Sequence, residues 1–320
     1  MKIILTGGKT MGHISPLLAL NERLKAKYEV VYIGLAHSME EKWAQKNNIS
    51  FLTIKAYPFY KKKFWKNIKT FYYLFREKKR LQKLFKQDVI AIYTTGGFVS
   101  IAPLLALKKQ NINKILIESN TEKGLASRLI SPYLTTVWYQ FPVFNDRLGI
   151  CKKMPIYYGN EYYMPKLYHQ EDKILFVGGS NGAEEIIELA ALFNQKYPHV
   201  LIFVLTGHKQ NLFHFNDRAI LLESIPSLVS VMKYFTLIIS RSGGATISEL
   251  IDTTSPNMLF PSKYVTNNHQ VKNAQMMLSL KATKIITTIF DYDKIYALFM
   301  NKNELLDLKK GLTRLKTLYK

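Results

Sequence analysis

The sequence predicts an α/β protein built from two doubly wound domains. Its 320 residues exceed what one hydrophobic core usually organises, and 48% of them are hydrophobic. A strand, a glycine turn, a helix and a second strand follow one another between residues 2 and 34, and the same order begins again at residue 173. Two such beginnings in one chain indicate two parallel sheets, each covered by helices.

The first half alternates short apolar runs with helical patterns. The opening run ends in Thr6-Gly7-Gly8, a helical pattern covers Ile14 to Lys25, and residues 29–34 form the next expected strand. Further strands are expected at residues 49–54, 89–93 and 114–118. Because a strand, a helix and a parallel strand form a crossover unit, these runs predict one parallel sheet with helices on both faces.

The second half repeats this organisation. A strand at residues 173–179 enters a glycine turn, and a helix is expected from Ala183 to Tyr197. The later strands are expected at residues 200–205, 219–222, 237–240 and 257–260. A polar, Tyr-rich stretch at residues 158–172 separates the halves. We therefore expect two Rossmann-like domains, residues 1–160 and 161–320, with a last helix able to pack back on the first domain.

Composition restricts the compartment and the partners. The formal net charge of +22 indicates an anionic partner, drift in composition, or both, since the chain is also rich in Asn, Ile and Tyr. The single cysteine, Cys151, allows no internal disulfide and no zinc site, which fits a reducing compartment.

The N-terminal apolar run is too short for a signal-peptide core. The apolar region at residues 89–107 is broken by Gly96-Gly97 and falls short of the roughly 18 residues of a spanning helix, so membrane contact is expected to be peripheral.

A glycine-rich turn, Thr6 to His13 (TGGKTMGH), lies between the first expected strand and the first helix. Glycines there allow close backbone approach, and a helix N-terminus offers unpaired N–H groups to an anion. The spacing differs from G-x-G-x-x-G, and Lys9 is not followed by the rest of a P-loop. The turn predicts either an anion site of another kind or an ordinary tight turn.

His13 is the candidate general base. A lone histidine is usually structural or on the surface, but His13 stands at both a glycine turn and a helix N-terminus. The positive end of the helix dipole disfavours the imidazolium form there. A neutral imidazole can accept a proton near pH 7.

The second domain carries two further turns of this kind. In Gly178 to Ala183 (GGSNGA), Ser180 can help to hold a diphosphate or can simply cap the following helix. In residues 240–250 (SRSGGATISEL), the N–H groups of residues 243–246 begin another helix. Glu249 lies near that helix start, where the dipole favours an acid and where a carboxylate can also accept ribose hydroxyls.

Gln270 and Asn273 are three residues apart and are expected to share a helix face. Carboxamides both donate to and accept from sugar hydroxyls, but isolated polar residues are also ordinary on a surface. Their pattern alone leaves both interpretations open.

These segments, taken in order, resemble the MurG-like family of GT-B glycosyltransferases, which move GlcNAc from UDP-GlcNAc to an undecaprenyl-diphosphate-linked muropeptide. Two more segments of the first domain belong to the series, Gly96 to Ser100 (GGFVS) and Ile117 to Asn120 (IESN). The matching segments run from residue 6 to residue 274. The resemblance implies the GT-B fold, in which two Rossmann-like domains face a cleft, and it implies no cofactor.

The resemblance also implies roles for individual residues. His13 is placed near the acceptor hydroxyl, and Gly96 and Gly97 are placed at the acceptor. No metal is implied, because two helix N-termini are expected to neutralise the leaving UDP. Contacts with the donor are implied for Thr10, Gly12, Asn120, Ser180, Asn181, Gly244, Ala245, Thr246, Glu249, Gln270 and Asn273.

The chain departs from the family pattern at several positions. Lys9 and Met11 replace glycines of the first turn, and Ile117 replaces a histidine. Glu161-Tyr162-Tyr163 follows Gly159-Asn160, where the family carries an arginine. These departures bear on the identity of the donor and the acceptor, and they leave the expected fold unchanged.

The segment at residues 57–86 interleaves aromatic and basic residues, with Glu77 as its only acid. Such a segment suits the headgroup layer of an anionic bilayer. The alternative is an amphipathic helix that packs its aromatic side chains into the domain core and keeps its lysines in water. Nucleic acid is not expected, because no recognised binding module accompanies the segment.

We therefore expect an inverting, metal-independent glycosyltransferase at the cytoplasmic face of the cell membrane. Its expected reaction converts the lipid-linked muropeptide (lipid I) into the disaccharide lipid (lipid II) of peptidoglycan synthesis. One alternative is a related enzyme that glycosylates diacylglycerol or a polysaccharide precursor. Another is a catalytically idle module that binds a membrane or a partner protein.

Overall fold

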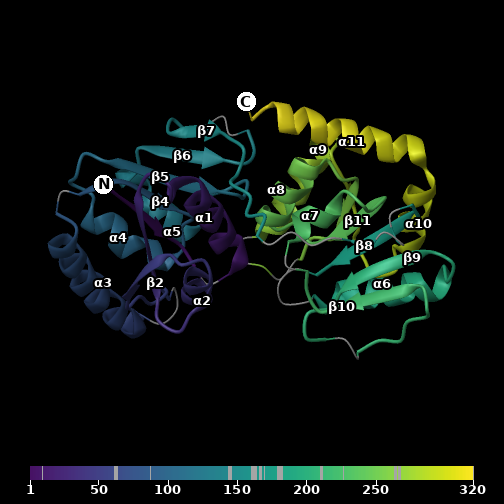
Figure 1. Cartoon of the computed structure of the whole chain (residues 1–320), viewed down its shortest axis with the longest axis horizontal. Coiled ribbons are helices and arrows are strands. Elements are labelled where there is room, and N and C mark those ends of the chain that lie inside the picture. Colours follow the sequence, from purple (N-terminus) through teal and green to yellow (C-terminus); the bar gives the residue numbers. More distant parts are fainter. Residues whose placement is uncertain are drawn as a thin grey trace. The chain divides into compact units, whose positions relative to one another are not determined.

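The computed structural model divides into two compact units, residues 1–157 and 158–320 (Figure 1). Each unit is an α/β domain with its own sheet. The structure describes residues 1–8, 10–60, 64–86, 88–142, 146–159, 164, 165, 168, 170–178, 183–209, 212–225, 227–262, 265 and 268–319.

The first unit is built on a seven-stranded sheet in the order β3-β2-β1-β4-β5-β6-β7. Neighbouring strands pair in parallel throughout. The strands are β1 (Lys2–Thr6), β2 (Glu29–Leu35), β3 (Ser50–Ile54), β4 (Val89–Thr94), β5 (Asn113–Glu118), β6 (Thr136–Tyr139) and β7 (Gly149–Cys151).

Alternate residues of these strands build two cores, one on each face of the sheet. Ile3 and Leu5 of β1 pack in the cluster that includes helices α1 and α2, whereas Ile4 packs in the cluster that includes α3, α4 and α5. This alternation follows from the two-residue period of a strand. The helical segments are α1 (Met11–Leu24), α2 (Met39–Lys46), α3 (Phe64–Leu84), η1 (Phe98–Ser100), α4 (Ile101–Ala106), α5 (Leu125–Ile130) and η2 (Ser131–Tyr133).

The second unit repeats the design with a six-stranded parallel sheet in the order β10-β9-β8-β11-β12-β13. Its large core joins β8, β9 and β11 to helices α6, α10 and α11. The strands are β8 (Lys173–Val177), β9 (Leu201–Leu205), β10 (Ala219–Leu222), β11 (Leu237–Ser240), β12 (Asn257–Leu259) and β13 (Lys284–Ile285). The helices are α6 (Glu184–Lys196), α7 (Leu228–Met232), α8 (Gly244–Thr253), α9 (His269–Ser279), α10 (Tyr292–Met300) and α11 (Lys302–Thr317).

The predicted fold class is confirmed, because both units are parallel-sheet α/β domains of the doubly wound type. In the first unit the chain runs outward from β1 to β3 and then returns to β4 on the other side of β1. In the second it runs from β8 to β10 and returns to β11 on the other side of β8. Each sheet therefore has a switch point, where ligands bind outside the carboxyl ends of the strands.

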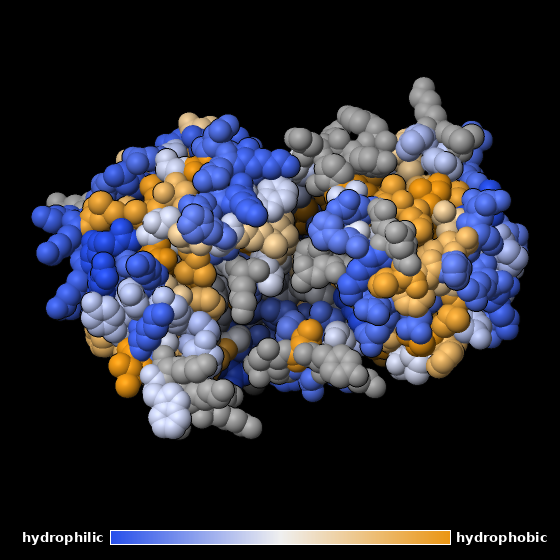
Figure 2. Space-filling view, turned by 90° about the horizontal axis from the view of Figure 1, so that it is seen from below, coloured by the Kyte–Doolittle hydropathy of each residue, from blue (hydrophilic) through white to orange (hydrophobic). Residues whose placement is uncertain are grey.

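Helix α3 exposes most of its aromatic side chains. It packs against α4, and Leu81 lies fully buried in that contact. Trp65 is 77% exposed, and the other exposed large apolar side chains of the helix are Ile68, Phe71, Tyr72, Phe75 and Leu84. Figure 2 shows hydrophobic and hydrophilic side chains interleaved on the surface of the protein. The alternative expectation, in which the aromatic side chains fill the domain core, is wrong for these residues.

Candidate active site

The switch point of the first unit brings together the loops that follow β1 and β4. A Cβ atom at Gly7 would overlap the Thr95 hydroxyl, so the close approach of the two loops requires glycine. The buried Tyr32 hydroxyl donates a 2.6 Å hydrogen bond to the carbonyl oxygen of Gly7. The first glycine turn is thus fixed from two sides.

His13 lies in the first turn of α1, as expected, and is half-buried. Its Nδ1 atom lies 2.9 Å from the carbonyl oxygen of Thr95, and the Thr95 hydroxyl donates to the carbonyl oxygen of His13 at 2.8 Å. A carbonyl oxygen only accepts, so Nδ1 must carry the proton in this contact. The neutral ring then keeps its lone pair on Nε2, which is the arrangement that a general base needs.

Thr10 and Gly12 flank the start of this helix. Thr10 is the exposed N-cap of α1, has an extended backbone, and makes no side-chain capping hydrogen bond. Gly12 lies within the first turn, between Thr10 and His13. Lys9, one of the departures from the family pattern, is outside the described residues.

Gly96 and Gly97 follow β4 with φ values of 83° and 81°. Glycine alone adopts this region without strain, so the conformation accounts for both residues. The Gly96 N–H group donates to the Thr94 hydroxyl at 2.9 Å, and the Ser100 hydroxyl donates to the Gly96 carbonyl at 2.6 Å. The loop is therefore held rigidly beside the turn that carries His13.

Glu118, at the end of β5, is a buried carboxyl group for which the sequence predicted no role. Burial raises the pKa of Glu118 to about 7, although hydrogen bonds from Asn120 act in the opposite direction. Oε1 of Glu118 accepts from the backbone N–H of Asn120 at 3.2 Å and from its carboxamide at 3.0 Å. The only sequence signal was the position of Glu118 at a strand end, next to the predicted Asn120.

In the second unit, the switch point lies where the neighbouring strands β8 and β11 end. Ser180 and Asn181 lie outside the described residues, and α6 begins at Glu184 with Ala183 as its N-cap. Arg241, directly after β11, joins α6 to the end of β12, because its guanidinium donates to Glu185 of α6 and, at 3.0 Å, to the carbonyl oxygen of Phe260.

Gly244, Ala245 and Thr246 form the first turn of α8, with Gly243 as the N-cap. The first intrahelical bond runs from the Ile247 N–H to the Gly243 carbonyl at 3.0 Å. The N–H groups of the first turn therefore precede that bond and lie at the positive end of the helix, which is the geometry that favours an anion. The predicted helix N-terminus is thus present, and its role in binding phosphate stays a prediction.

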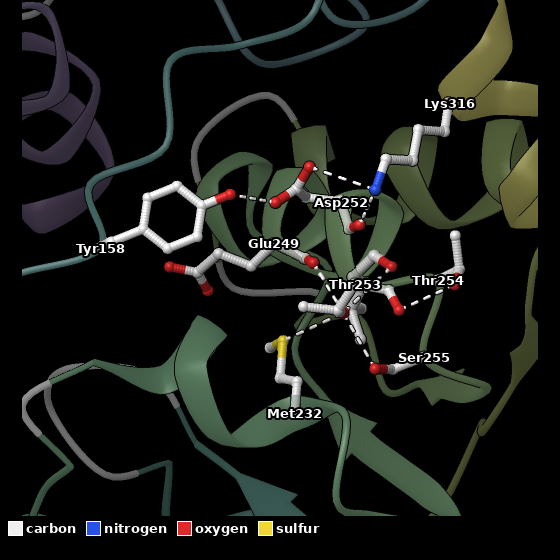
Figure 3. Close-up of polar contacts among 9 residues, drawn as sticks. Tyr158, Met232, Glu249, Asp252, Thr253, Thr254, Ser255 and Lys316 are labelled. Atoms are coloured by element: carbon white, nitrogen blue, oxygen red, sulfur yellow. Dashed lines mark hydrogen bonds and ion pairs between the residues drawn. The ribbon is translucent and has the colours of Figure 1, made fainter. Parts of the chain in front are cut away.

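Glu249 is on α8, but in its second turn, so the expectation that it lies near the helix start is wrong. Among the described residues its carboxylate has no hydrogen-bond or ion-pair partner, and Figure 3 shows it turned away from Asp252 and Lys316. Burial raises the pKa of Glu249 to about 7. The helix dipole therefore does not explain why an acid stands at this position, whereas a ligand hydroxyl would give the carboxylate a hydrogen-bond donor.

Gln270 and Asn273 both lie on α9, and both contact the loops of the switch point. Oε1 of Gln270 accepts a 2.9 Å bond from the Ser262 N–H, and its backbone carbonyl accepts from the Ser242 hydroxyl at 2.7 Å. Asn273 is 0% exposed and donates to the Ser242 carbonyl at 3.1 Å. Asn273 is therefore not a surface residue, and it supports the loop that precedes α8.

Two general features complete the site. No group of three or more His, Cys, Asp or Glu side chains that could hold a metal ion occurs among the described residues. Within the same part of the chain, none of the helices has the length and apolar character needed to cross a membrane.

Comparison with known proteins agrees with this geometry. The N-terminal domain of glycosyltransferase family 28 matches residues 3–139, and the C-terminal domain of that family matches residues 173–298. The solved structure of Acinetobacter baumannii MurG covers 98% of this chain, and the chain covers 94% of it, with a TM-score of 0.72 and 21% identity. The spinosyn forosaminyltransferase SpnP gives a TM-score of 0.74 at 10% identity, over 100% of this chain and 94% of its own. The fold and its switch points thus define a GT-B glycosyltransferase.

Two curated relatives place the chain more narrowly. Both are named UDP-N-acetylglucosamine--N-acetylmuramyl-(pentapeptide) pyrophosphoryl-undecaprenol N-acetylglucosamine transferase. The Lactobacillus acidophilus protein is 31% identical over 89% of this chain and 86% of its own length. The Halalkalibacterium halodurans protein is 31% identical over 86% of this chain and 82% of its own length. The chain belongs to the MurG family of glycosyltransferases.

Proposed function

We propose that this protein transfers GlcNAc from UDP-GlcNAc to the undecaprenyl-diphosphate-linked muropeptide, converting lipid I into lipid II. The observation that carries the proposal is the orientation of His13, whose Nδ1 is held 2.9 Å from the Thr95 carbonyl. The names of the curated relatives describe this same transfer for those proteins. A positioned base at one switch point and a helix N-terminus at the other provide what the reaction requires.

In the proposed reaction, Nε2 of His13 removes the proton from the acceptor sugar hydroxyl. The acceptor oxygen forms a bond to the anomeric carbon of GlcNAc while the bond from that carbon to the UDP oxygen breaks. A single displacement of this kind inverts the anomeric carbon. Loss of the proton from the attacking hydroxyl makes it a better nucleophile, which is the usual contribution of a general base.

The leaving UDP gathers negative charge on its diphosphate. The first-turn N–H groups of Gly244, Ala245 and Thr246 are aligned to meet that charge at the positive end of α8. Ser180 and Asn181 are proposed to meet the same phosphates from the other loop. This arrangement supports transfer without a divalent metal, and unchanged turnover in the presence of EDTA would test it.

The remaining contacts with UDP-GlcNAc are proposed for side chains on and around α8. Glu249 is proposed to accept the two ribose hydroxyls, since its carboxylate has no other partner among the described residues. Gln270 uses only Oε1 in its contact with Ser262, which leaves its amide hydrogens for a sugar hydroxyl. Asn273 acts through the loop that it supports. Thr10, Gly12 and Asn120 are proposed to meet the donor from the first unit.

The acceptor is proposed to approach Gly96 and Gly97. A Cβ atom at Gly97 would meet no other atom within 4 Å, so this glycine borders open space. Its neighbour Gly96 is buried. Gly97 therefore offers accessible backbone on a fixed loop, adjacent to the turn that carries His13.

Helix α3 is proposed as the membrane contact of the first unit, at the cytoplasmic face of the cell membrane. Its exposed Trp65, Phe71, Tyr72 and Phe75 can enter the headgroup layer, while neighbouring lysines and arginines attract anionic lipid. Lys61, Lys62 and Lys63 belong to the same basic segment but lie outside the described residues. Such a contact would hold the enzyme at the same membrane surface in which a lipid-linked acceptor is anchored.

A second candidate is a related transferase with another donor or acceptor. The observation that favours it is the set of departures from the family pattern, Lys9, Met11, Ile117 and the Glu161 to Tyr163 segment. Incubation of the protein with a panel of UDP-sugars, each with lipid I and with diacylglycerol, tests the choice. Transfer of GlcNAc to lipid I alone supports the main proposal, and transfer of a hexose to diacylglycerol supports the second. An idle binding module would transfer nothing in either assay.

A further inference from the structure

Asp252, three residues after Glu249 on α8, binds partners from distant parts of the second unit (Figure 3). The Tyr158 hydroxyl donates to Oδ2 of Asp252, and Nζ of Lys316 lies 3.5 Å from Oδ1. Lys316 also donates to the backbone carbonyl of Asp252. Only 9% of the Asp252 side chain is exposed, so its charge is balanced in a place where water is scarce. One carboxylate thereby ties residue 158 and α11 to the same turn of α8.

Glu249 and Asp252 have opposite surroundings although they are separated by less than one helical turn. Asp252 holds the phenol and the ammonium group, whereas the Glu249 carboxylate has neither. In Figure 3 the Glu249 carboxylate lies on the side of Asp252 where the Tyr158 ring is found, and it points away from Lys316. The pairing of Asp252 therefore leaves Glu249 available to a ligand.

Tyr158 is anchored at its hydroxyl, yet the residue is 47% exposed. A fixed aromatic ring with an open surface is suited to contact a flat or apolar ligand group. The next residue, Gly159, has φ 59°, so the chain changes direction immediately after the ring. The ring is therefore presented beside Glu249 by a contact at its hydroxyl and by a turn at its backbone.

We propose that Tyr158 contacts the nucleoside of the sugar-nucleotide donor, with Asp252 and Lys316 as positioning residues that hold its ring. The inference rests on the proposed function, in which Glu249 accepts the ribose hydroxyls. A ribose held by Glu249 lies beside the Tyr158 ring, which then meets the ribose or the attached base. Asp252 and Lys316 touch no ligand in this account and act through the Tyr158 hydroxyl.

The test is calorimetric titration of UDP into the full-length protein and into Tyr158→Ala, Tyr158→Phe and Lys316→Met. Loss of an aromatic contact with a base weakens affinity roughly 5- to 150-fold, so we expect a loss of that size for Tyr158→Ala. Tyr158→Phe keeps the ring but removes the hydroxyl group that donates to Asp252. Lys316→Met removes the cation that pairs with Asp252. Both should weaken UDP binding less than Tyr158→Ala does.

A matched control exists in the same unit. The Tyr197 hydroxyl donates to Asp293, and Nζ of Lys196 lies 3.7 Å from the same carboxylate. This trio has the same chemistry, but Lys196 and Tyr197 lie at the end of α6 and Asp293 lies on α10. Tyr197→Phe should leave UDP affinity at the parental value.

The outcomes separate the two proposals. Parental UDP affinity in Tyr158→Ala would overturn this inference and leave the proposed function standing. A folded parent protein that does not bind UDP would remove the proposed function and this inference with it. If circular dichroism shows that Tyr158→Ala does not fold, Tyr158→Leu takes its place. A leucine variant that binds UDP as tightly as Tyr158→Phe would then overturn the aromatic contact.

Discussion

The carbonyl oxygen of Thr95 orients the ring of His13, at 2.9 Å from Nδ1, across 82 positions of the sequence. The Thr95 hydroxyl returns a bond to the His13 backbone, so the two residues hold each other. The contact fixes the tautomer that leaves Nε2 able to accept a proton. It is the feature of the first unit that most directly specifies a base.

His13→Ala should therefore lower turnover by about 10²- to 10⁴-fold, the usual contribution of a general base. The affinity for UDP-GlcNAc should stay close to the parental value, because the base acts on the acceptor. Steady-state kinetics and calorimetry measure the two effects separately. His208→Ala is the control, since its side chain is 94% exposed in the second unit. Turnover near the parental value in His13→Ala would remove this residue from the mechanism.

Glu249→Gln should weaken the binding of UDP-GlcNAc by roughly 1 to 3 kcal/mol, as expected for lost hydrogen bonds to a charged group. The control is Asp307→Asn, an exposed acid on α11, which should change nothing. Unchanged donor affinity in a folded Glu249→Gln protein would show that the carboxylate does not hold the ribose.

Donor binding should also depend on pH through Glu249. Burial raises the pKa of this carboxyl to about 7, and the ionised form is the better acceptor for two hydroxyls. Affinity should thus increase as the pH rises from 6 to 8, and it should level off above the pKa. Calorimetry with UDP-GlcNAc across this range measures the effect. Glu249→Gln should flatten the profile, and a parental profile that is already flat would contradict the assignment.

Glu118 should make folding stability depend on pH. Burial raises its pKa in the folded protein to about 7 from an ordinary value near 4.5, so the folded state binds the proton more tightly than the unfolded state. Its stabilising contribution is complete below the unfolded pKa and is lost as the pH rises through the folded pKa. Glu118→Gln should therefore reduce the difference in unfolding free energy between pH 5 and pH 8. Urea denaturation measures this difference, with the exposed Glu122→Gln as control.

An unchanged difference in Glu118→Gln would show that the carboxyl group is not held protonated at neutral pH. Glu249 contributes with the same sign, because its pKa is also raised to about 7. The double variant Glu118→Gln with Glu249→Gln should therefore have the flattest dependence of the series.

Helix α3 provides a prediction about the membrane. Replacement of Trp65 and Phe75 by serine should reduce sedimentation with anionic vesicles and transfer to an acceptor embedded in them. Activity on a detergent-soluble acceptor should stay at the parental level. Each nearby Lys or Arg adds about 1 kcal/mol of attraction to anionic lipid, so binding should also fall as salt rises. The control replaces Phe290 and Leu306 of the second unit, which are 67% and 51% exposed. Equal loss of vesicle binding in the control would refute a specific role for α3.

Local patterns in the sequence predicted most of the sheet. The strands at residues 219–222 and 237–240 have the predicted bounds, because apolar runs flanked by turns are a strong local signal. β6, the three-residue β7 and the two-residue β13 were not predicted. β13 is recognisable only by its pairing with β12. β6 is a strand of four residues in a part of the sheet where the sequence has a weak apolar pattern.

The candidate site likewise combines positions that local sequence patterns predicted with contacts that they did not predict. Glycine turns and helix starts are local, so the positions of His13 and of residues 244–246 followed from the sequence. The contact of His13 with Thr95 joins helix α1 to the loop after β4, and no local pattern encodes it. The burial of Glu118 and of Asn273 depends likewise on distant packing. Tertiary contacts thus assign to Asn273 a supporting role that its amide group alone could not reveal.

Transfer of GlcNAc to lipid I is measured with purified lipid I and radiolabelled UDP-GlcNAc. Incubation with the parent protein should move the label into a lipid that carries a GlcNAc-containing disaccharide, with release of UDP. His13→Ala, folded and still able to bind UDP, should form this product at about 10²- to 10⁴-fold lower rate. Absence of labelled lipid with the parent protein, under conditions where it binds UDP-GlcNAc, would contradict the proposed function.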